Sequence, residues 1–146
     1  MKYSYVFPII LLLGALVAPH AARSDAPPEE SALYFYKAKI TDVYDADTVT
    51  ADVDLGFYVW LHEQKFRLYG INATEVKGGK KEAGKKCRDM LAAQIFGKEV
   101  LIQSIKNPKE KDKKEKYGRW LAVIWYNGVN MNEWVVAQNC GVHAEY

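Results

Sequence analysis

The 146-residue sequence has few of the features that identify a chemistry on their own. It contains only two cysteines, Cys87 and Cys140, and they do not have metal-ligand spacing. No internal repeat is present. Its one long apolar run, from Val6 to Ala18, is broken by Pro8 and Gly14, and it is shorter than the roughly 20 apolar residues that cross a bilayer. The chain therefore shows no sign of a cysteine-ligated metal site, a repeat array or a comfortable membrane-spanning helix.

The N-terminus has the pattern of a secretory signal peptide. Lys2 precedes the apolar run, and small residues follow it, at Ala21, Ala22 and Ser24. Cleavage after Ala22 or Ser24 fits best, and an uncleaved anchor is the alternative. We expect a signal peptide over 1–24, a mobile linker over 25–34 and one domain over 35–146. This predicts export to the periplasm or the medium, without stable membrane association after cleavage.

The charge balance gives no support for a globally basic protein. The full chain has a formal net charge of +2, and removal of residues 1–24 takes away Lys2 and Arg23 and no acidic residue, which leaves zero. The distribution is more informative, because Asp25–Glu63 is acid-rich and Lys77–Arg119 is lysine-rich. One part of the domain could hold a cation while another meets a polyanion.

Hydrophobic patterning predicts a small α+β domain that is mainly β. With 49% hydrophobic residues the chain can form a packed core. Alternating apolar residues predict strands, with Leu55–Gln64 as a long aromatic connection; the strands are expected over Tyr36–Val43, Thr48–Asp54, Lys65–Ile71, Val100–Ile105 and Leu121–Tyr126. Helical spacing predicts a helix over Glu82–Phe96 and a last helix that opens at Asn130 or Asn132 and ends at Gly141. These elements fit a five-stranded OB-fold barrel with two to three packed helices.

Four side chains along the chain suggest phosphodiester chemistry when taken together. Arg67 and Arg119 can neutralise a phosphodiester and the charge that grows on it during attack. Glu75 can orient or deprotonate a water molecule, and Asp47 can help to hold a hard divalent cation. Each residue taken alone is more typical of a surface or turn position. The ordered set favours catalysis.

This ordered set resembles the staphylococcal nuclease (thermonuclease) family over Tyr36–Tyr146. The resemblance rests on Asp-x-Asp-Thr, Phe-Arg-Leu, Glu and Lys-Tyr-Gly-Arg, which occur here in that order. It implies an OB-fold enzyme that uses one calcium ion to hydrolyse DNA and RNA and leaves 3′-phosphate ends. It also implies nucleic acid as partner. We expect single strands to be preferred and the protein to be a monomer.

The resemblance assigns roles to individual residues of this chain. Arg67 and Arg119 match the phosphate-binding pair, Glu75 the general base, and Tyr117 a donor to a nucleotide phosphate. The metal ligands would be Asp47, Asn72 and the backbone carbonyl of Ala73. Asn72 departs from the family pattern, which has a second aspartate there, so weaker calcium binding is expected. Thr74 replaces a proline and Ala46 replaces a turn glycine, and both changes are expected to tune the loops.

Other assignments remain open at this stage. Lys80, Lys81 and Lys114 are either solvated or in contact with phosphates, and Tyr117 is either a substrate contact or a core residue. Trp60 is the best candidate for base stacking, and packing is its alternative. Cys87 and Cys140 form either a disulfide or two buried thiols.

Two other functions compete with the nuclease. One is a catalytically silent OB-fold module that binds nucleic acid or protein, which Asn72 favours and Glu75 disfavours. The other is a phosphodiesterase for a small molecule, which the lysine-rich stretches disfavour.

Overall fold

The computed structural model describes residues 34–74, 81–105 and 118–145. Five strands form a closed barrel: β1 (Phe35–Asp45), β2 (Thr48–Asp54), β3 (Trp60–Leu68), β5 (Glu99–Ser104) and β6 (Trp120–Tyr126). The remaining elements are β4 (Ile71–Ala73), α1 (Lys81–Ile95), β7 (Val129–Asn130), α2 (Met131–Ala137) and β8 (Gly141–His143). This architecture confirms the predicted OB-fold-like class. The predicted signal peptide over 1–24 and nearly all of the 25–34 linker lie outside the described residues.

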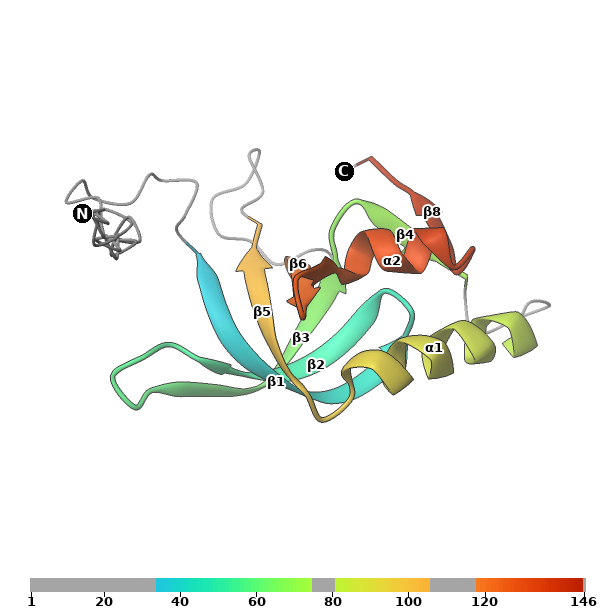
Figure 1. Cartoon of the computed structure of the whole chain (residues 1–146). Coiled ribbons are helices and arrows are strands. Elements are labelled where there is room, and N and C mark those ends of the chain that lie inside the picture. Colours follow the sequence, from blue (N-terminus) through green and yellow to red (C-terminus); the bar gives the residue numbers. More distant parts are fainter. Residues whose placement is uncertain (1–33, 75–80, 106–117, 146) are drawn as a thin grey trace, which may run out of the picture.

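The strand order β3-β2-β1-β5-β6 is closed by a parallel pairing of β3 with β6 (Figure 1). Arg67 lies opposite Leu121 in this pairing. All other pairings in the barrel are antiparallel. The closing pair joins segments that are far apart in sequence, and it brings the end of β3 next to the start of β6.

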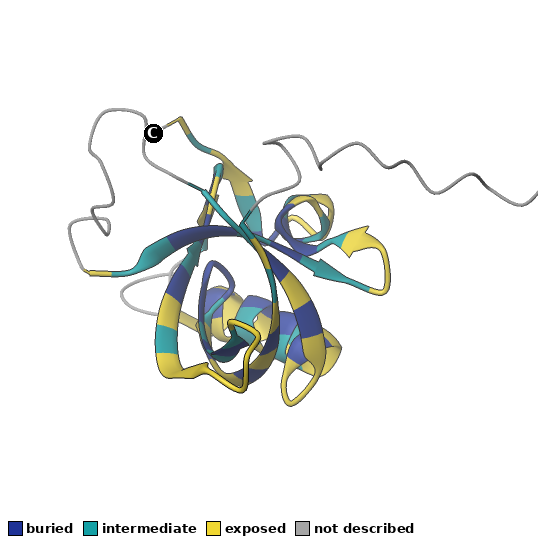
Figure 2. Cartoon of the chain, turned by 90° about the vertical axis from the view of Figure 1, so that its left-hand side faces the viewer, coloured by how far each residue is buried: buried dark blue, intermediate teal, exposed yellow. Residues whose placement is uncertain are grey.

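Alternation along the strands builds the core inside the barrel. Figure 2 shows buried and exposed residues alternating along the strands. Val49, Ala51 and Val53 of β2 are buried, as the sequence pattern predicts. They pack with Ile40 of β1 and Ile102 of β5, among other buried side chains. The apolar core therefore fills the interior of the barrel, and polar side chains can lie at the ends of the strands.

Two helices pack on this barrel. Helix α1 runs along β1 and buries Cys87, Leu91 and Ile95. A disulfide joins Cys87 to Cys140, whose Cα atoms are 5.3 Å apart. It ties α1 to the segment between α2 and β8. No helix among the described residues is long and apolar enough to cross a membrane.

Three predicted element boundaries differ from the structure by three residues or more. Strand β3 begins at Trp60 rather than Lys65, because its first residues pair with β2 while their side chains stay exposed, so no alternation marks them. The same strand ends at Leu68, because Gly70 turns the chain with a φ of +76° before β4 starts at Ile71.

The third error concerns the last helix. α2 ends at Ala137, where the backbone N–H of Gln138 donates to carbonyls of the last turn, and Gly141 opens β8 instead. Asn130 is the N-cap, since its side chain accepts from the N–H groups of Asn132 and Glu133. The predicted cap is therefore the first of the two candidates.

Candidate functional site

The candidate site begins at the acidic turn between β1 and β2. Asp45 ends β1, and its Oδ1 accepts a hydrogen bond of 3.1 Å from the backbone N–H of Asp47. This bond holds the turn closed, with Ala46 fully buried. Asp47 is itself only 3% exposed. A carboxylate this buried is stable only when it has partners.

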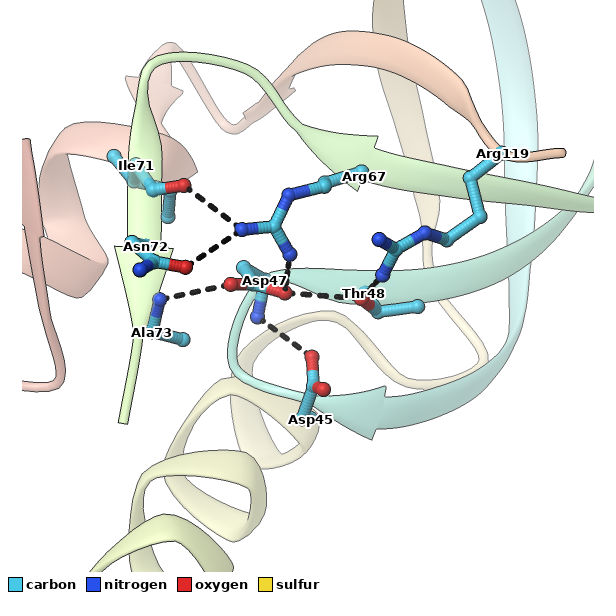
Figure 3. Close-up of polar contacts among 8 residues, drawn as sticks. All are labelled: Asp45, Asp47, Thr48, Arg67, Ile71, Asn72, Ala73 and Arg119. Carbon is cyan, nitrogen blue, oxygen red and sulfur yellow. Dashed lines mark hydrogen bonds and ion pairs between the residues drawn. The ribbon is translucent and has the colours of Figure 1, made fainter. Parts of the chain in front are cut away.

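The Asp47 carboxylate has three hydrogen-bond partners from different parts of the fold (Figure 3). Its Oδ1 accepts from Nη1 of Arg67 at 2.7 Å and from the hydroxyl of Thr48 at 2.9 Å. Its Oδ2 accepts from the backbone N–H of Ala73 at 2.8 Å. Asp47 therefore fixes the relative positions of β2, β3 and β4 at this end of the barrel.

Arg67 joins Asp47 to Asn72. Its Nη2 donates to the side-chain oxygen of Asn72 at 2.8 Å and, more weakly, to the carbonyl of Ile71 at 3.5 Å. In Figure 3 the guanidinium lies between the two side-chain oxygens. The acid and the amide thus converge on one cationic group, and the guanidinium is held in one orientation.

Arg119 reaches the same cluster through Thr48. Its Nη1 donates to the Thr48 hydroxyl at 2.8 Å, and that hydroxyl in turn donates to Asp47. Arg119 directly precedes β6, and the β3–β6 pairing places this point beside Arg67. Two arginines that are distant in sequence therefore share one buried carboxylate, one directly and one through a hydroxyl.

Strand β4 is held in place by the C-terminal segment. It pairs with β8, with Ala73 opposite Gly141. A Cβ at Gly141 would lie 3.1 Å from the carbonyl oxygen of Asn72, so a side chain there would require the β4 backbone to shift by a few tenths of an ångström. Buried Asn132 of α2 also donates to the carbonyl of Tyr69, in the turn that leads into β4. These contacts position Asn72 and Ala73.

The environment of Asp45 differs from that of Asp47. Burial raises the pKa of Asp45 to about 6, and the neighbouring Asp47 carboxylate contributes to the same shift. The Asp45 carboxyl is therefore mostly protonated below about pH 6.

The structure brings together five of the predicted site residues: Asp47, Arg67, Asn72, Ala73 and Arg119. Lys81 is the exposed first residue of α1 and makes no described contact with this cluster. Four further predicted residues, Glu75, Tyr117, Lys80 and Lys114, lie outside the described residues. Trp60, the stacking candidate, begins β3 and stacks on His62.

Thr48 is the contact that sequence reasoning missed. The Asp-x-Asp-Thr pattern contains it but assigns it no role. A hydroxyl directly after an acidic turn, on a strand that pairs with Arg67, was the signal that could have identified it.

The chemistry of the oxygens fits a hard cation. The side-chain oxygens of Asp47 and Asn72 already converge on the positive charge of Arg67, and carboxylate and amide oxygens are the donors that calcium prefers. Within 34–74, 81–105 and 118–145 there is no group of three or more His, Cys, Asp or Glu side chains that could hold a metal. Among these residues the donor set thus contains a single anionic ligand, Asp47.

Comparison with known proteins agrees with this geometry. The chain is 30% identical over 111 residues to an uncharacterized protein of Bacillus anthracis; the match covers 74% of this chain and 47% of that protein. The chain therefore spans about half the length of this curated relative. A family model described as "Staphylococcal nuclease homologue" matches residues 65–145, which include Arg67, Asn72 and Arg119. The chain belongs to the family of staphylococcal nuclease homologues.

Proposed function

We propose that this protein is an exported, calcium-dependent endonuclease that hydrolyses phosphodiester bonds of DNA and RNA with low sequence specificity and leaves 3′-phosphate ends. The observation that carries the proposal is the convergence of Arg67 and Arg119 on Asp47 and Thr48. Membership of the nuclease-homologue family supports it. The Cys87–Cys140 disulfide supports export, because disulfides persist in oxidising compartments.

The two arginines bind and neutralise the scissile phosphate. Arg67 is oriented before substrate arrives, because Asp47 and Asn72 hold its two terminal nitrogens at 2.7 and 2.8 Å. Arg119 is oriented by Thr48 at 2.8 Å. Donors that are fixed in advance stabilise the extra charge of the pentacoordinate state without reorganising, which is worth more than the same charges on free side chains.

Glu75 is the residue proposed to position and deprotonate the attacking water. It follows Thr74, whose backbone N–H donates to the carbonyl of Cys140 at 3.0 Å. The chain that leads to Glu75 is thus attached to the C-terminal segment. Glu75 itself lies outside the described residues, so its role rests on the family resemblance.

Asp47, Asn72 and the Ala73 carbonyl are proposed to hold calcium, which supplies a Lewis acid that polarises the phosphoryl oxygen. In the described arrangement both oxygens of Asp47 accept from protein donors. A metal ion can therefore bind to Asp47 only if these donors share the carboxylate oxygens with the ion or move to other acceptors. With Asn72 in place of a second carboxylate, calcium is expected to bind more weakly.

A catalytically silent OB-fold binding module remains the second candidate. The observation that favours it is the saturation of Asp47 together with the neutral Asn72. Such a module would bind nucleic acid through Arg67 and Arg119 and leave it intact.

The decisive experiment is degradation of single-stranded DNA and of RNA by purified mature protein, with millimolar calcium and with excess chelator. Glu75→Gln and Arg119→Ala are the test variants, and we expect each to lose about 10²–10³-fold in rate. Arg88→Ala is the matched control, because Arg88 lies on α1 and, within the described part of the chain, bonds to its exposed neighbour Asp89. Wild-type turnover by both folded test variants would refute the assignment. Binding without cutting at any calcium concentration would establish the silent module.

The product ends provide an independent check. If cleavage leaves 3′-phosphates, a DNA polymerase will extend the products only after phosphatase treatment. Direct extension would contradict the proposed cleavage chemistry.

A further inference from the structure

The tip of the β2–β3 hairpin exposes large apolar side chains. Phe57 is 97% exposed and Tyr58 is 101% exposed, relative to reference values for an isolated residue. The neighbouring apolar residues of the tip are also exposed, namely Leu55, Val59, Trp60 and Leu61. In Figure 1 the hairpin projects from the barrel on the side away from α1. We call residues 55–61 the aromatic tip. Contiguous exposed apolar surface of this kind marks an interaction site in soluble proteins.

The backbone of the aromatic tip adopts a strained conformation. Three successive residues, Gly56, Phe57 and Tyr58, have positive φ values of 77°, 52° and 61°. Glycine adopts this conformation freely, but each aromatic residue costs about 1–2 kcal/mol. The N–H of Leu55 donates to the carbonyl of Val59, and the N–H of Val59 donates to the carbonyl of Gly56, each at 2.9 Å, which closes the turn. No burial in the described fold offsets this cost, so the exposure of Phe57 and Tyr58 is not explained by stability.

The aromatic tip is remote from the candidate site. Arg67 pairs with Thr48 at one end of the hairpin, and Trp60 pairs with Asp54 at the other. Thr48 and Asp54 are six positions apart on β2, which corresponds to roughly 20 Å at 3.3 Å per residue. The tip is therefore a separate surface, and a role for it does not depend on the proposed nuclease activity.

The charges behind the aromatic tip nearly balance. The hairpin carries three acidic side chains there, Asp52, Asp54 and Glu63. Exposed Lys37 and Lys39 of β1 lie opposite Asp54 and Asp52. Asp52 accepts from His62 Nδ1 at 3.1 Å and from the N–H of Glu63 at 2.8 Å, which holds the base of the hairpin in shape. The hairpin itself has no Lys or Arg, since residues 40–64 contain none, so the tip lacks the basic cluster that binds a phosphate backbone or an anionic lipid surface.

We propose that the aromatic tip docks on the surface of a bilayer of zwitterionic lipids. Phe57, Tyr58 and Trp60 would enter the interfacial layer, where aromatic side chains are most favoured. Because the charges behind the tip nearly balance, they favour a lipid surface that carries no net charge. When a narrow projecting tip enters a lipid interface, lipid contacts its side chains on all sides. A flat protein surface would contact only the end of the tip. This reversible docking goes beyond the expectation that the mature protein has no stable membrane association.

The test is sedimentation of the mature protein with phosphatidylcholine vesicles. We expect binding that falls at least tenfold in the Phe57→Ser/Tyr58→Ser variant. Phe96→Ser is the matched control, because Phe96 is an exposed aromatic residue that directly follows α1 and is not part of the aromatic tip. Phe96→Ser and Arg119→Ala should bind vesicles like wild type. Replacing half of the lipid by phosphatidylglycerol at low salt should not strengthen binding.

Several outcomes would overturn the proposal. One is no binding to any vesicle. Others are equal loss in Phe96→Ser, or stronger binding to phosphatidylglycerol vesicles. If instead the tip variant loses affinity for single-stranded DNA without any vesicle binding, the tip is a base-stacking surface. If it alters only the sedimentation equilibrium of the protein alone, the tip contacts a second copy of the chain.

Discussion

Replacement of Thr48 by valine tests the connection between Arg119 and Asp47. Valine has nearly the same shape, but it lacks the hydroxyl that accepts from Arg119 at 2.8 Å and donates to Asp47 at 2.9 Å. Hydrogen bonds to charged groups contribute about 1.5–3 kcal/mol each. Water can replace the bond at partly exposed Arg119, but not at buried Asp47. We therefore expect a loss of about 2 kcal/mol in the free energy of unfolding.

The same change should also affect catalysis. Arg119 would lose the contact with Thr48 that orients it, so kcat/KM for single-stranded DNA should fall about tenfold, a change equivalent to 1.4 kcal/mol. Thr48→Ser is the control, because it keeps the hydroxyl, and it should retain most of both properties. Urea unfolding followed by tryptophan fluorescence gives the stability, and a nuclease assay gives the rate.

The result that refutes this reasoning is specific. If the free energy of unfolding of Thr48→Val lies within about 0.5 kcal/mol of the wild-type value, the hydroxyl does not stabilise Asp47. If Thr48→Ser is destabilised as much as Thr48→Val, packing of the methyl group is responsible instead of the hydrogen bonds.

Three further predictions follow from other parts of the structure. Asn72→Asp should lower the calcium concentration for half-maximal activity, and calcium binding measured by calorimetry should tighten about tenfold or more. The reason is that a charge in contact with the ion contributes about 4 kcal/mol at an effective dielectric constant of 20, before desolvation reduces this value. If neither quantity changes, Asn72 is not a calcium ligand. The Cys87→Ser/Cys140→Ser variant should lose about 4 kcal/mol in the free energy of unfolding measured with urea, because the disulfide spans 53 residues. The wild-type protein with its disulfide reduced should show the same loss. The Asp52 carboxyl should titrate by NMR below its ordinary value of 3.8, because the N–H of Glu63 and then His62 stabilise its charged form. Its contribution to stability is therefore present above pH 3.8 and is lost as the pH falls through the lowered value, and His62→Ala should raise that pKa partway.

Much of the barrel could be predicted because its strands follow the simplest pattern. Val49, Ala51 and Val53 alternate with polar residues, so the sequence marks both the strand and its inner face. The first half of β3 could not be found this way. Its side chains are exposed on both faces and it contains a register shift opposite Ala51 and Val53, so neither alternation nor burial identifies it.

The candidate site was predictable as a set of residues but not as a set of contacts. The spacing along the chain suggested that Asp47, Arg67 and Arg119 act together. It did not indicate that Thr48 would connect Arg119 to Asp47, or that Arg67 would bridge Asp47 and Asn72. These contacts depend on the register of the β2–β3 and β3–β6 pairings, which is set by the packing of the whole barrel.

The parallel β3–β6 pair that closes the barrel also has a consequence for folding. Arg67 and Arg119 meet only when this closing pair has formed, and contacts between segments so far apart in sequence form slowly. A chain that lacks β6, or has not yet closed, cannot assemble the arginine pair. Recovery of activity during refolding should therefore coincide with the final closure of the barrel rather than with the formation of the first β1–β2–β3 meander.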